Sequence, residues 1–232
     1  MKLSIVIPVF NEIQTIKKII RKIEEVDLGN IKKEIILVDD YSTDGTREII
    51  KKLNEKYVKI FQKKNQGKGA ALKAGIRAAN GDFIIFQDAD LEYEPKDYTK
   101  LLQPILENKT NITFGSRFIN QKFSILEKNR TMHPIHWIGN RFLTAVFNIL
   151  YGTSLTDVEP CYKMFKSDIL KNVDVKSNGF EYDIELMCRL VKKGYKILQL
   201  PISYHPRTFG EGKKINWKDG FIAFITMIKH MF

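Results

Sequence analysis

The chain has 232 residues, of which 44% are hydrophobic and 28% are charged. This composition excludes a disordered chain, a collagen-like chain and a small disulfide-bonded scaffold, and the length suits a single large α/β domain. The net charge of +11 is unevenly distributed, with +2 in residues 1–108 and +9 in residues 109–232. Such an excess predicts an anionic partner, which could be a nucleic acid, an acidic membrane surface or a phosphorylated ligand.

The two cysteines, Cys161 and Cys188, are far apart and form no CxxC pair. They predict neither a disulfide framework nor a zinc site, and they favour a reducing, cytoplasmic compartment. The apolar run at residues 3–10 lacks the features of a signal peptide. Another apolar run, Phe221–Ile228, is far shorter than the roughly 20 residues needed to span a bilayer. We therefore expect a protein that is soluble or lies on a membrane surface.

The first half of the chain alternates short apolar runs with amphipathic segments. Apolar runs predict buried strands at Leu3–Pro8, Glu34–Val38, Val58–Phe61, Phe83–Phe86 and Ile112–Phe114. Helical spacing of apolar residues predicts helices over Ile13–Ile23, around Ile49–Leu53 and after Gly69, the first with Asn11 as its N-cap and Gln14 as its capping-box partner. This alternation predicts a mostly parallel sheet with helices on both faces.

The second half is less regular. We expect helices over residues 137–151 and over Glu181–Lys193, followed by a strand in Lys196–Tyr204 that Pro201 places at an edge of the sheet. Residues 211–232 predict a basic amphipathic helix, because apolar residues recur at helical spacing from Trp217 to Phe232 among lysines. Such a helix can pack against its own core or lie on an anionic bilayer.

Paired carboxylates follow two of the predicted strands. Asp88 and Asp90 follow Phe83–Phe86, and Asp39 and Asp40 follow the second strand. Parallel strands end at the same edge of a sheet, where open α/β sheets bind ligands. Oxygen ligands there suit Mg²⁺ or Mn²⁺ shared with a diphosphate, or hydrogen bonds to a nucleoside. The alternative for the first pair is that both carboxylates only cap a turn.

Two further segments belong to this predicted edge. Pro8–Glu12 leaves the first strand and enters the first helix, where backbone N–H groups are available to a nucleotide. Lys63–Gly69 precedes the third helix and could hold phosphate, although its spacing is not that of a P-loop.

Together these segments resemble the ordered motifs of family 2 glycosyltransferases, and more narrowly those of dolichyl-phosphate mannose and glucose synthases. The matching segments are Ser4–Glu12, Leu37–Thr46, Asn65–Gly69, Asp88–Glu92, Gly115–Phe118, Leu155–Asp157 and Tyr204–Arg207. The resemblance implies a GT-A fold, which is Rossmann-like, as one catalytic domain over residues 1–210, with a nucleotide-sugar half at 1–108 and an acceptor half at 109–210. It also implies a donor of the GDP-mannose or UDP-glucose type, Mg²⁺ or Mn²⁺, inversion at the anomeric carbon and a polyprenyl or dolichyl phosphate acceptor.

The resemblance also implies roles for single residues. The nucleotide-sugar would be bound by Pro8, Phe10, Asn11, Glu12, Asp39, Gly67, Lys68, Asp88, Ala89 and Asp90. The metal would be held by Asp88 and Asp90, with Glu92 as a third ligand where many relatives have Gln. Arg117 would meet the acceptor phosphate, and Arg207 and Lys213 would meet donor or acceptor phosphates. Arg130, which precedes the amphipathic stretch, is a further candidate for the acceptor phosphate.

The sequence departs from the family pattern in two places. Cys161 and Tyr162 stand where many relatives have Gly and Phe, so we expect the acceptor or sugar pocket to differ. Membrane-anchored relatives carry transmembrane helices after the catalytic domain, whereas this chain ends at Phe232. We therefore expect it to reach a lipid by surface contact, on the cytoplasmic face of the membrane, or through a membrane-anchored partner protein.

The acceptor decides whether a catalytic base is needed. A lipid phosphate is already an anionic nucleophile, whereas a sugar hydroxyl needs a carboxylate within hydrogen-bond reach. Asp157 is the candidate base and Glu159 the second, and the alternative is that Asp157 forms a salt bridge or a cap. With Asp90 as the metal ligand that assists departure of the diphosphate, Asp90 and Asp157 are the candidate catalytic residues.

Two other classes of protein compete with an enzyme. A nucleic-acid-binding protein would use the basic half, but the sequence contains no recognisable reader module, and the acidic strand ends would repel a phosphate backbone. We expect no nucleic acid partner. A non-catalytic nucleotide-binding protein with this fold would bind a nucleotide-sugar without transferring the sugar.

Overall fold

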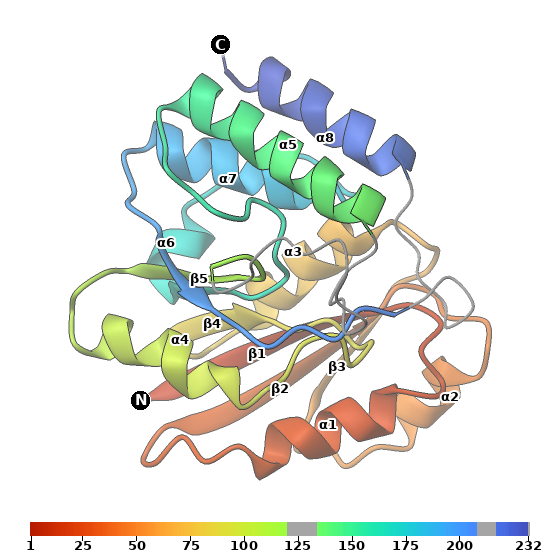
Figure 1. The fold of residues 1–232 in the computed structure, drawn as a ribbon. Helices are drawn as coiled ribbons and strands as arrows, with labels where there is room; N and C mark the ends of the chain where they lie inside the picture. The colour runs from red at the N-terminus through yellow and green to blue at the C-terminus, as the bar shows by residue number, and fades with distance from the viewer. Residues whose placement is uncertain (120–133, 208–216, 232) are drawn as a thin grey trace.

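The computed structural model describes residues 1–119, 134–207 and 217–231 (Figure 1). The strands are β1 (Lys2–Val9), β2 (Lys32–Asp39), β3 (Val58–Phe61), β4 (Phe83–Phe86), β5 (Ile112–Ser116), β6 (Lys163–Lys166) and β7 (Leu198–Pro201). The helices are α1 (Ile16–Glu25), α2 (Thr46–Lys51), α3 (Lys68–Ala78), α4 (Asp97–Leu106), α5 (Pro134–Tyr151), α6 (Ser167–Lys171), α7 (Tyr182–Lys192) and α8 (Trp217–Lys229).

The strands form one seven-stranded sheet in the order β3-β2-β1-β4-β6-β5-β7. All neighbouring strands are parallel except at β6, which runs antiparallel to both β4 and β5. The prediction of a mostly parallel sheet is therefore confirmed, and β7 lies at the edge as Pro201 predicts. Strand β6 was not predicted, because its short sequence, KMFK, shows no clear pattern.

The sheet is covered on both faces. In Figure 1, α1 lies below the sheet, and α3, α6 and α7 lie above it. Leu3, Ile5, Val6 and Ile7 of β1 are all fully buried, as expected for a strand whose two sides both face the core. Burial of this apolar surface is the main term that stabilises the fold.

The start of α1 differs from the prediction. The helix begins at Ile16, and Thr15, rather than Asn11, stands at its N-cap without a side-chain cap hydrogen bond. Asn11 has a φ of 50°, and its Oδ1 accepts a hydrogen bond of 2.8 Å from the backbone N–H of Thr43. The predicted cap is wrong, because Asn11 instead links the loops that follow β1 and β2.

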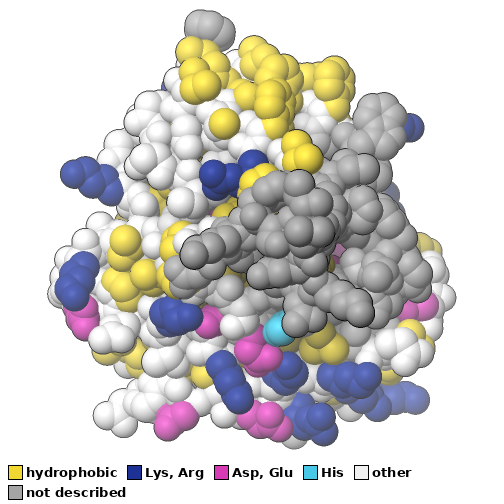
Figure 2. All heavy atoms as spheres, viewed as in Figure 1, with side chains coloured by type: hydrophobic (Ala, Val, Ile, Leu, Met, Phe, Trp, Pro, Cys, Tyr) yellow, Lys and Arg dark blue, Asp and Glu magenta, His cyan; other side chains and the backbone are white. Residues whose placement is uncertain are grey.

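The helix α8 lies beside α5 and α7. Ala223 and Met227 are buried, and Tyr151 donates a hydrogen bond of 2.7 Å to the Met227 carbonyl. The opposite side of α8 is exposed and apolar, with Phe221 and Ile225 among its residues. Hydrophobic side chains accordingly gather at the top of Figure 2, over α5 and α8. Within the part of the chain that the structure describes, no helix is long and apolar enough to cross a membrane.

Candidate active site

A cavity of about 580 Å³ opens at the carboxyl ends of β1 and β4 and extends to α5 and α8. The register explains its position, because Val6 pairs with Phe86 and Val9 pairs with Asp39, so the loops after β1, β2 and β4 meet at one edge. The predicted residues that line it are Pro8, Phe10, Glu12, Gly67, Lys68, Asp88, Ala89, Asp90, Glu92, Arg117, Arg207 and the second candidate base, Glu159. Asn11, Asp39 and Asp157 do not line it, and Arg130 and Lys213 lie outside the described residues.

The two carboxylates that follow β2, Asp39 and Asp40, lie in different surroundings. Asp40 lines the cavity, and its carboxylate accepts hydrogen bonds of 2.8 Å from the backbone N–H groups of Gln66 and Gly67. Asp39 is fully buried and forms an ion pair of 3.2 Å with Arg47. The strand pattern placed both carboxylates at the correct edge, but it could not tell which one faces the cavity.

Gly67 and Gly69 allow two loops to approach closely. Gly67 has a φ of 96°, and a Cβ at this position would lie 2.4 Å from the Asn178 carbonyl oxygen. The backbone N–H of Gly69 donates to the Gly179 carbonyl at 3.2 Å, next to Phe180 and Glu181 of the cavity wall. These glycines therefore join the 65–69 loop to the 178–181 loop, which lies more than a hundred residues further along the chain.

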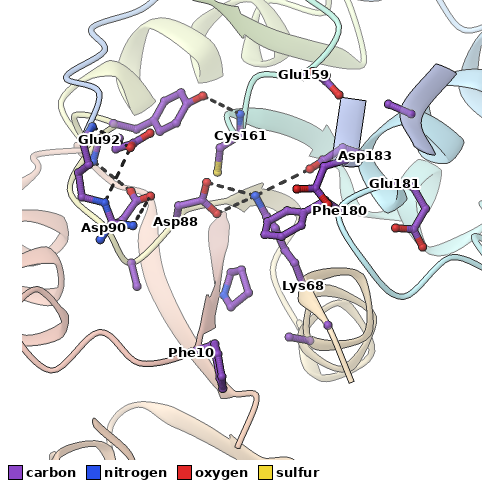
Figure 3. A pocket seen from close by; sticks show the side chains of 18 of the residues that line it. Phe10, Lys68, Asp88, Asp90, Glu92, Glu159, Cys161, Phe180, Glu181 and Asp183 are labelled. Carbon is purple, nitrogen blue, oxygen red and sulfur yellow. Dashed lines mark hydrogen bonds and ion pairs between the residues drawn. The ribbon is translucent and has the colours of Figure 1, made fainter. Parts of the chain in front are cut away.

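Lys68 lies at the centre of the cavity, between two carboxylates (Figure 3). Its Nζ is 2.8 Å from Asp88 Oδ1 and 3.8 Å from Asp183 Oδ2, and Asp183 is also paired with Lys163 at 2.7 Å. Burial opposes the charge on Lys68, but the neighbouring carboxylates, chiefly Asp88, outweigh it and raise the pKa of Lys68 well above its usual value. Lys68 therefore stays charged and can also meet a phosphate.

Arg207 lies between three carboxylates on the opposite wall. Its guanidinium is 3.1 Å from Glu12 Oε2 and 3.1 Å from Asp90 Oδ2, and its Nε is 3.8 Å from Glu92 Oε1. Glu92 also accepts hydrogen bonds from the Tyr204 hydroxyl at 3.0 Å and the Arg207 backbone at 2.9 Å. One guanidinium thus contacts three acidic side chains.

The pKa of Asp90 is set by its burial and by the neighbouring carboxylates. Burial, together with repulsion from Asp88 and Glu92, raises the pKa of Asp90 to about 7. A divalent cation beside Asp88 and Asp90 would remove that repulsion. Among the described residues no group of three or more His, Cys, Asp or Glu side chains is arranged to hold a metal ion. Asp88 and Asp90, which both line the cavity, fit an ion such as Mg²⁺, which takes one or two carboxylates from the protein and its other ligands from diphosphate and water.

Arg117 and Asp157 form a buried ion pair at the acceptor side. Arg117 Nε and Nη2 each lie 2.8 Å from an Asp157 oxygen, and the backbone N–H groups of Arg117 and Glu159 donate to the same carboxylate at 3.1 and 3.2 Å. Asp157 is fully buried, whereas Arg117 lines the cavity and also donates to Asn140 at 3.0 Å. This geometry matches the salt-bridge alternative for Asp157.

Several cavity residues were not among the predicted site residues. Asn65, Tyr93, Cys161 and Tyr204 line the cavity, and Cys161 donates its backbone N–H to the Tyr93 hydroxyl at 3.1 Å. Asn65 lies within a predicted motif and could have been chosen for that reason. Tyr204 also lies within a predicted motif, Tyr93 directly follows another, and Cys161 stands where the sequence departs from the family pattern, so each had a signal in the sequence.

Comparisons with known proteins show to which family the chain is similar. The model of glycosyl transferase family 2 matches residues 4–174. Glycosyltransferase AglJ of Haloferax volcanii is 26% identical over 97% of this chain and 70% of its own length. The dolichol-phosphate mannosyltransferase of Pyrococcus furiosus is 30% identical over 92% of this chain, and the low-salt glycan biosynthesis hexosyltransferase Agl6 of Haloferax volcanii is 30% identical over 94%. The chain spans 59% and 51% of the length of these last two relatives.

The solved structures include glucosyl-3-phosphoglycerate synthase of Mycobacterium tuberculosis in complex with Mg²⁺ and uridine diphosphate. It superposes with a TM-score of 0.74 at 18% identity, over 99% of this chain and 79% of that chain. This likeness confirms the predicted α/β fold of the GT-A type.

Proposed function

The chain belongs to glycosyl transferase family 2 and is an enzyme of that class, and on this basis we propose that it transfers a hexose, mannose or glucose, from a nucleoside-diphosphate sugar to the phosphate of a polyprenyl or dolichyl lipid. The observation that carries the proposal is the charge arrangement in one cavity, where Asp88 and Asp90 lie with Lys68, Arg207 and Arg117. The similarity to the dolichol-phosphate mannosyltransferase of Pyrococcus furiosus supports the lipid phosphate as acceptor.

The donor would lie along the cavity with its nucleoside at the Pro8 and Phe10 end and its diphosphate beside Lys68. The proposed donor carries either uracil, as in UDP-glucose, or guanine, as in GDP-mannose. Asn11 and Asp39 would act from behind this end, since Asn11 links the two strand-end loops and Asp39 pairs with Arg47. Their effect on the nucleoside would therefore be indirect.

Mg²⁺ or Mn²⁺ would be held by Asp88 and Asp90, with Glu92 beside them. When bound, the ion acts as a Lewis acid toward the negative charge that develops on the leaving diphosphate. The chain's own cations act in the same direction, because Lys68 and Arg207 both lie in the cavity and carry fixed positive charge. The solved fold relatives crystallised with Mn²⁺ and uridine diphosphate support this choice of ion.

The transfer step needs no proton acceptor. An oxygen of the lipid phosphate forms a bond to the anomeric carbon, and the bond from that carbon to the β-phosphate oxygen breaks and leaves its electron pair on the nucleoside diphosphate. Attack from the side opposite the leaving group inverts the anomeric carbon. Arg117, which lines the cavity, would bind the acceptor phosphate, and Arg130 and Lys213 stay candidates for the same role. Asp157 lies outside the cavity and would position Arg117 rather than remove a proton.

The lipid acceptor would be reached at the surface formed by α5 and α8. Exposed apolar side chains lie on both helices, among them Phe142 and Ile149 on α5 and Phe221 on α8. Leu143 and Ala223 of the same helices line the cavity that Asp88 also lines. Contact with an anionic membrane, at its cytoplasmic face, or with a membrane-anchored partner would cover the apolar side chains.

A transfer assay tests the proposal. UDP-glucose and GDP-mannose are each supplied with polyprenyl phosphate, with the non-phosphorylated polyprenol or with a glycoside, in the presence of Mg²⁺, Mn²⁺ or a chelator. We expect a glycosylated polyprenyl phosphate from one donor, formed only with a divalent metal. Transfer to the polyprenol or the glycoside, or binding of donor without transfer to any acceptor, would overturn the proposed acceptor.

A further inference from the structure

Glu159 is one of the cavity carboxylates that the proposed transfer does not use. It belongs to the segment before β6, and its side chain lines the cavity. Its backbone N–H donates to Asp157, but within the described ranges no hydrogen bond or ion pair reaches its carboxylate. Asp183, which Figure 3 shows nearby, is by contrast paired with Lys163 and Lys68. An unpaired carboxylate that faces a cavity is available to a ligand.

The backbone around Glu159 is held firmly. On one side, Asp157 is fixed by its four hydrogen bonds from Arg117 and Glu159. On the other side, Pro160 and Cys161 are buried, and Cys161 donates to the Tyr93 hydroxyl. A side chain on such a rigid segment can bind a ligand in one well-defined geometry.

The order of residues along the cavity indicates which part of a ligand would meet Glu159. In Figure 3, Phe10 lies at one end, Asp88 and Lys68 lie in the middle, and Glu159 lies at the opposite end. A nucleoside-diphosphate sugar has the same order of nucleoside, diphosphate and hexose. With the nucleoside at Phe10 and the diphosphate beside Lys68, the hexose extends toward Glu159.

The chemistry of the Glu159 carboxylate favours a sugar over a phosphate as its ligand. A carboxylate repels a phosphate, whereas sugar hydroxyls are neutral and can both donate and accept hydrogen bonds. Burial, partly opposed by Arg117, raises the pKa of Glu159 to about 7, so near neutral pH the group can accept a hydrogen bond from a hydroxyl or donate one to it. Arg117, close by, provides the positive charge that a phosphate needs.

Resting on the proposed function, we infer that Glu159 hydrogen-bonds to a hydroxyl of the hexose in the donor and thereby determines which hexose is transferred. Loss of the Glu159 carboxylate should weaken binding of the nucleotide-sugar without weakening binding of the nucleoside diphosphate. Glu159→Ala should weaken binding of the nucleotide-sugar about 10- to 100-fold, the range for one charge-assisted hydrogen bond, and should leave binding of the nucleoside diphosphate within about twofold. Glu159→Gln, which keeps the shape and one acceptor, should lie between the wild type and Glu159→Ala.

The binding experiment uses calorimetry with UDP, GDP, UDP-glucose, GDP-mannose and monodeoxy analogues of the bound nucleotide-sugar. The wild type should bind one of the monodeoxy analogues about 10- to 100-fold more weakly than it binds the parent nucleotide-sugar. Glu159→Ala should bind that analogue and the parent nucleotide-sugar equally well. Glu107→Gln is the matched control, because Glu107 lies at the end of α4 and pairs with Lys109, outside the cavity. This control should show the wild-type profile.

Two results would overturn the inference, and a third would overturn the proposed function instead. If both Glu159 variants kept the wild-type deoxy profile, or if they raised only the KM for polyprenyl phosphate, Glu159 would not read the donor sugar. If the wild type bound neither UDP-glucose nor GDP-mannose, the proposed donor class itself would be wrong. The Gln variant keeps the test decisive if the Ala variant unfolds.

Discussion

Two ion pairs of this protein contain the same kinds of charge but face different surroundings. Asp88 pairs with Lys68 inside the cavity, where both side chains are accessible to a ligand. Asp157 pairs with Arg117, but only Arg117 reaches the cavity, because four hydrogen bonds enclose the Asp157 carboxylate. A buried carboxylate is therefore a candidate for chemistry only where at least one of its oxygens meets the cavity.

The largest expected effect is on stability, at the pair outside the cavity. Asp157→Asn removes the counter-charge of buried Arg117 and should lower the free energy of unfolding by about 3–5 kcal/mol, measured by urea denaturation. Transfer should persist in the folded fraction, with a raised KM for polyprenyl phosphate. A loss of several orders of magnitude in kcat with unchanged stability would contradict this comparison and favour Asp157 as a base.

The next effect is on catalysis, at the carboxylates inside the cavity. Asp90→Asn should lower kcat about 10²- to 10³-fold, because it removes a ligand of the proposed metal and weakens stabilisation of the leaving diphosphate. Its Tm should stay constant or rise, since Asp90 is repelled by Asp88 and Glu92 in the absence of metal. A strong fall in Tm would show that the carboxylate of Asp90, like that of Asp157, stabilises the fold.

A smaller effect concerns the loop contact that shapes the donor end. Gly67→Ala should cost about 1–3 kcal/mol and weaken nucleotide binding, because the new Cβ meets the Asn178 carbonyl and φ is positive. Gly152→Ala is the matched control: its φ is 63°, but a Cβ there meets nothing within 4 Å. Thermal unfolding and calorimetry with UDP and GDP should show a smaller loss of stability and no loss of binding in the control.

The smallest effect is expected at Glu185, a buried carboxylate remote from both pairs. Hydrogen bonds from the backbone of Lys176, from Ser177 and from Arg189 outweigh burial and lower its pKa to about 2. The stability it contributes, about 1–2 kcal/mol after solvent screening, is present above about pH 4.5 and disappears as the pH falls through 2. The Tm difference between wild type and Glu185→Gln should therefore shrink from pH 5 to pH 2. A constant difference would show that the charge of Glu185 does not matter.

Local sequence determined much of the donor side. Apolar runs that end in Asp39–Asp40 and Asp88–Asp90 predicted parallel strands and a shared acidic edge, because the carboxyl ends of parallel strands must meet. The bounds of β3 and β4 were predicted correctly, and β4, whose four residues are all buried, is a continuous apolar run.

The tertiary structure decided which of these residues face the cavity and what lies opposite them. Asp40 rather than Asp39 lines it, Asn11 links two loops instead of capping α1, and the antiparallel strand β6 follows the segment that places Glu159 and Cys161 in the far wall. Long-range contacts, such as Gly67 with Asn178, fix these positions, and their sequence separation leaves no local pattern. The physical reason is that periodicity encodes which face of an element is buried, whereas only the assembled sheet determines which carboxylates stay unpaired.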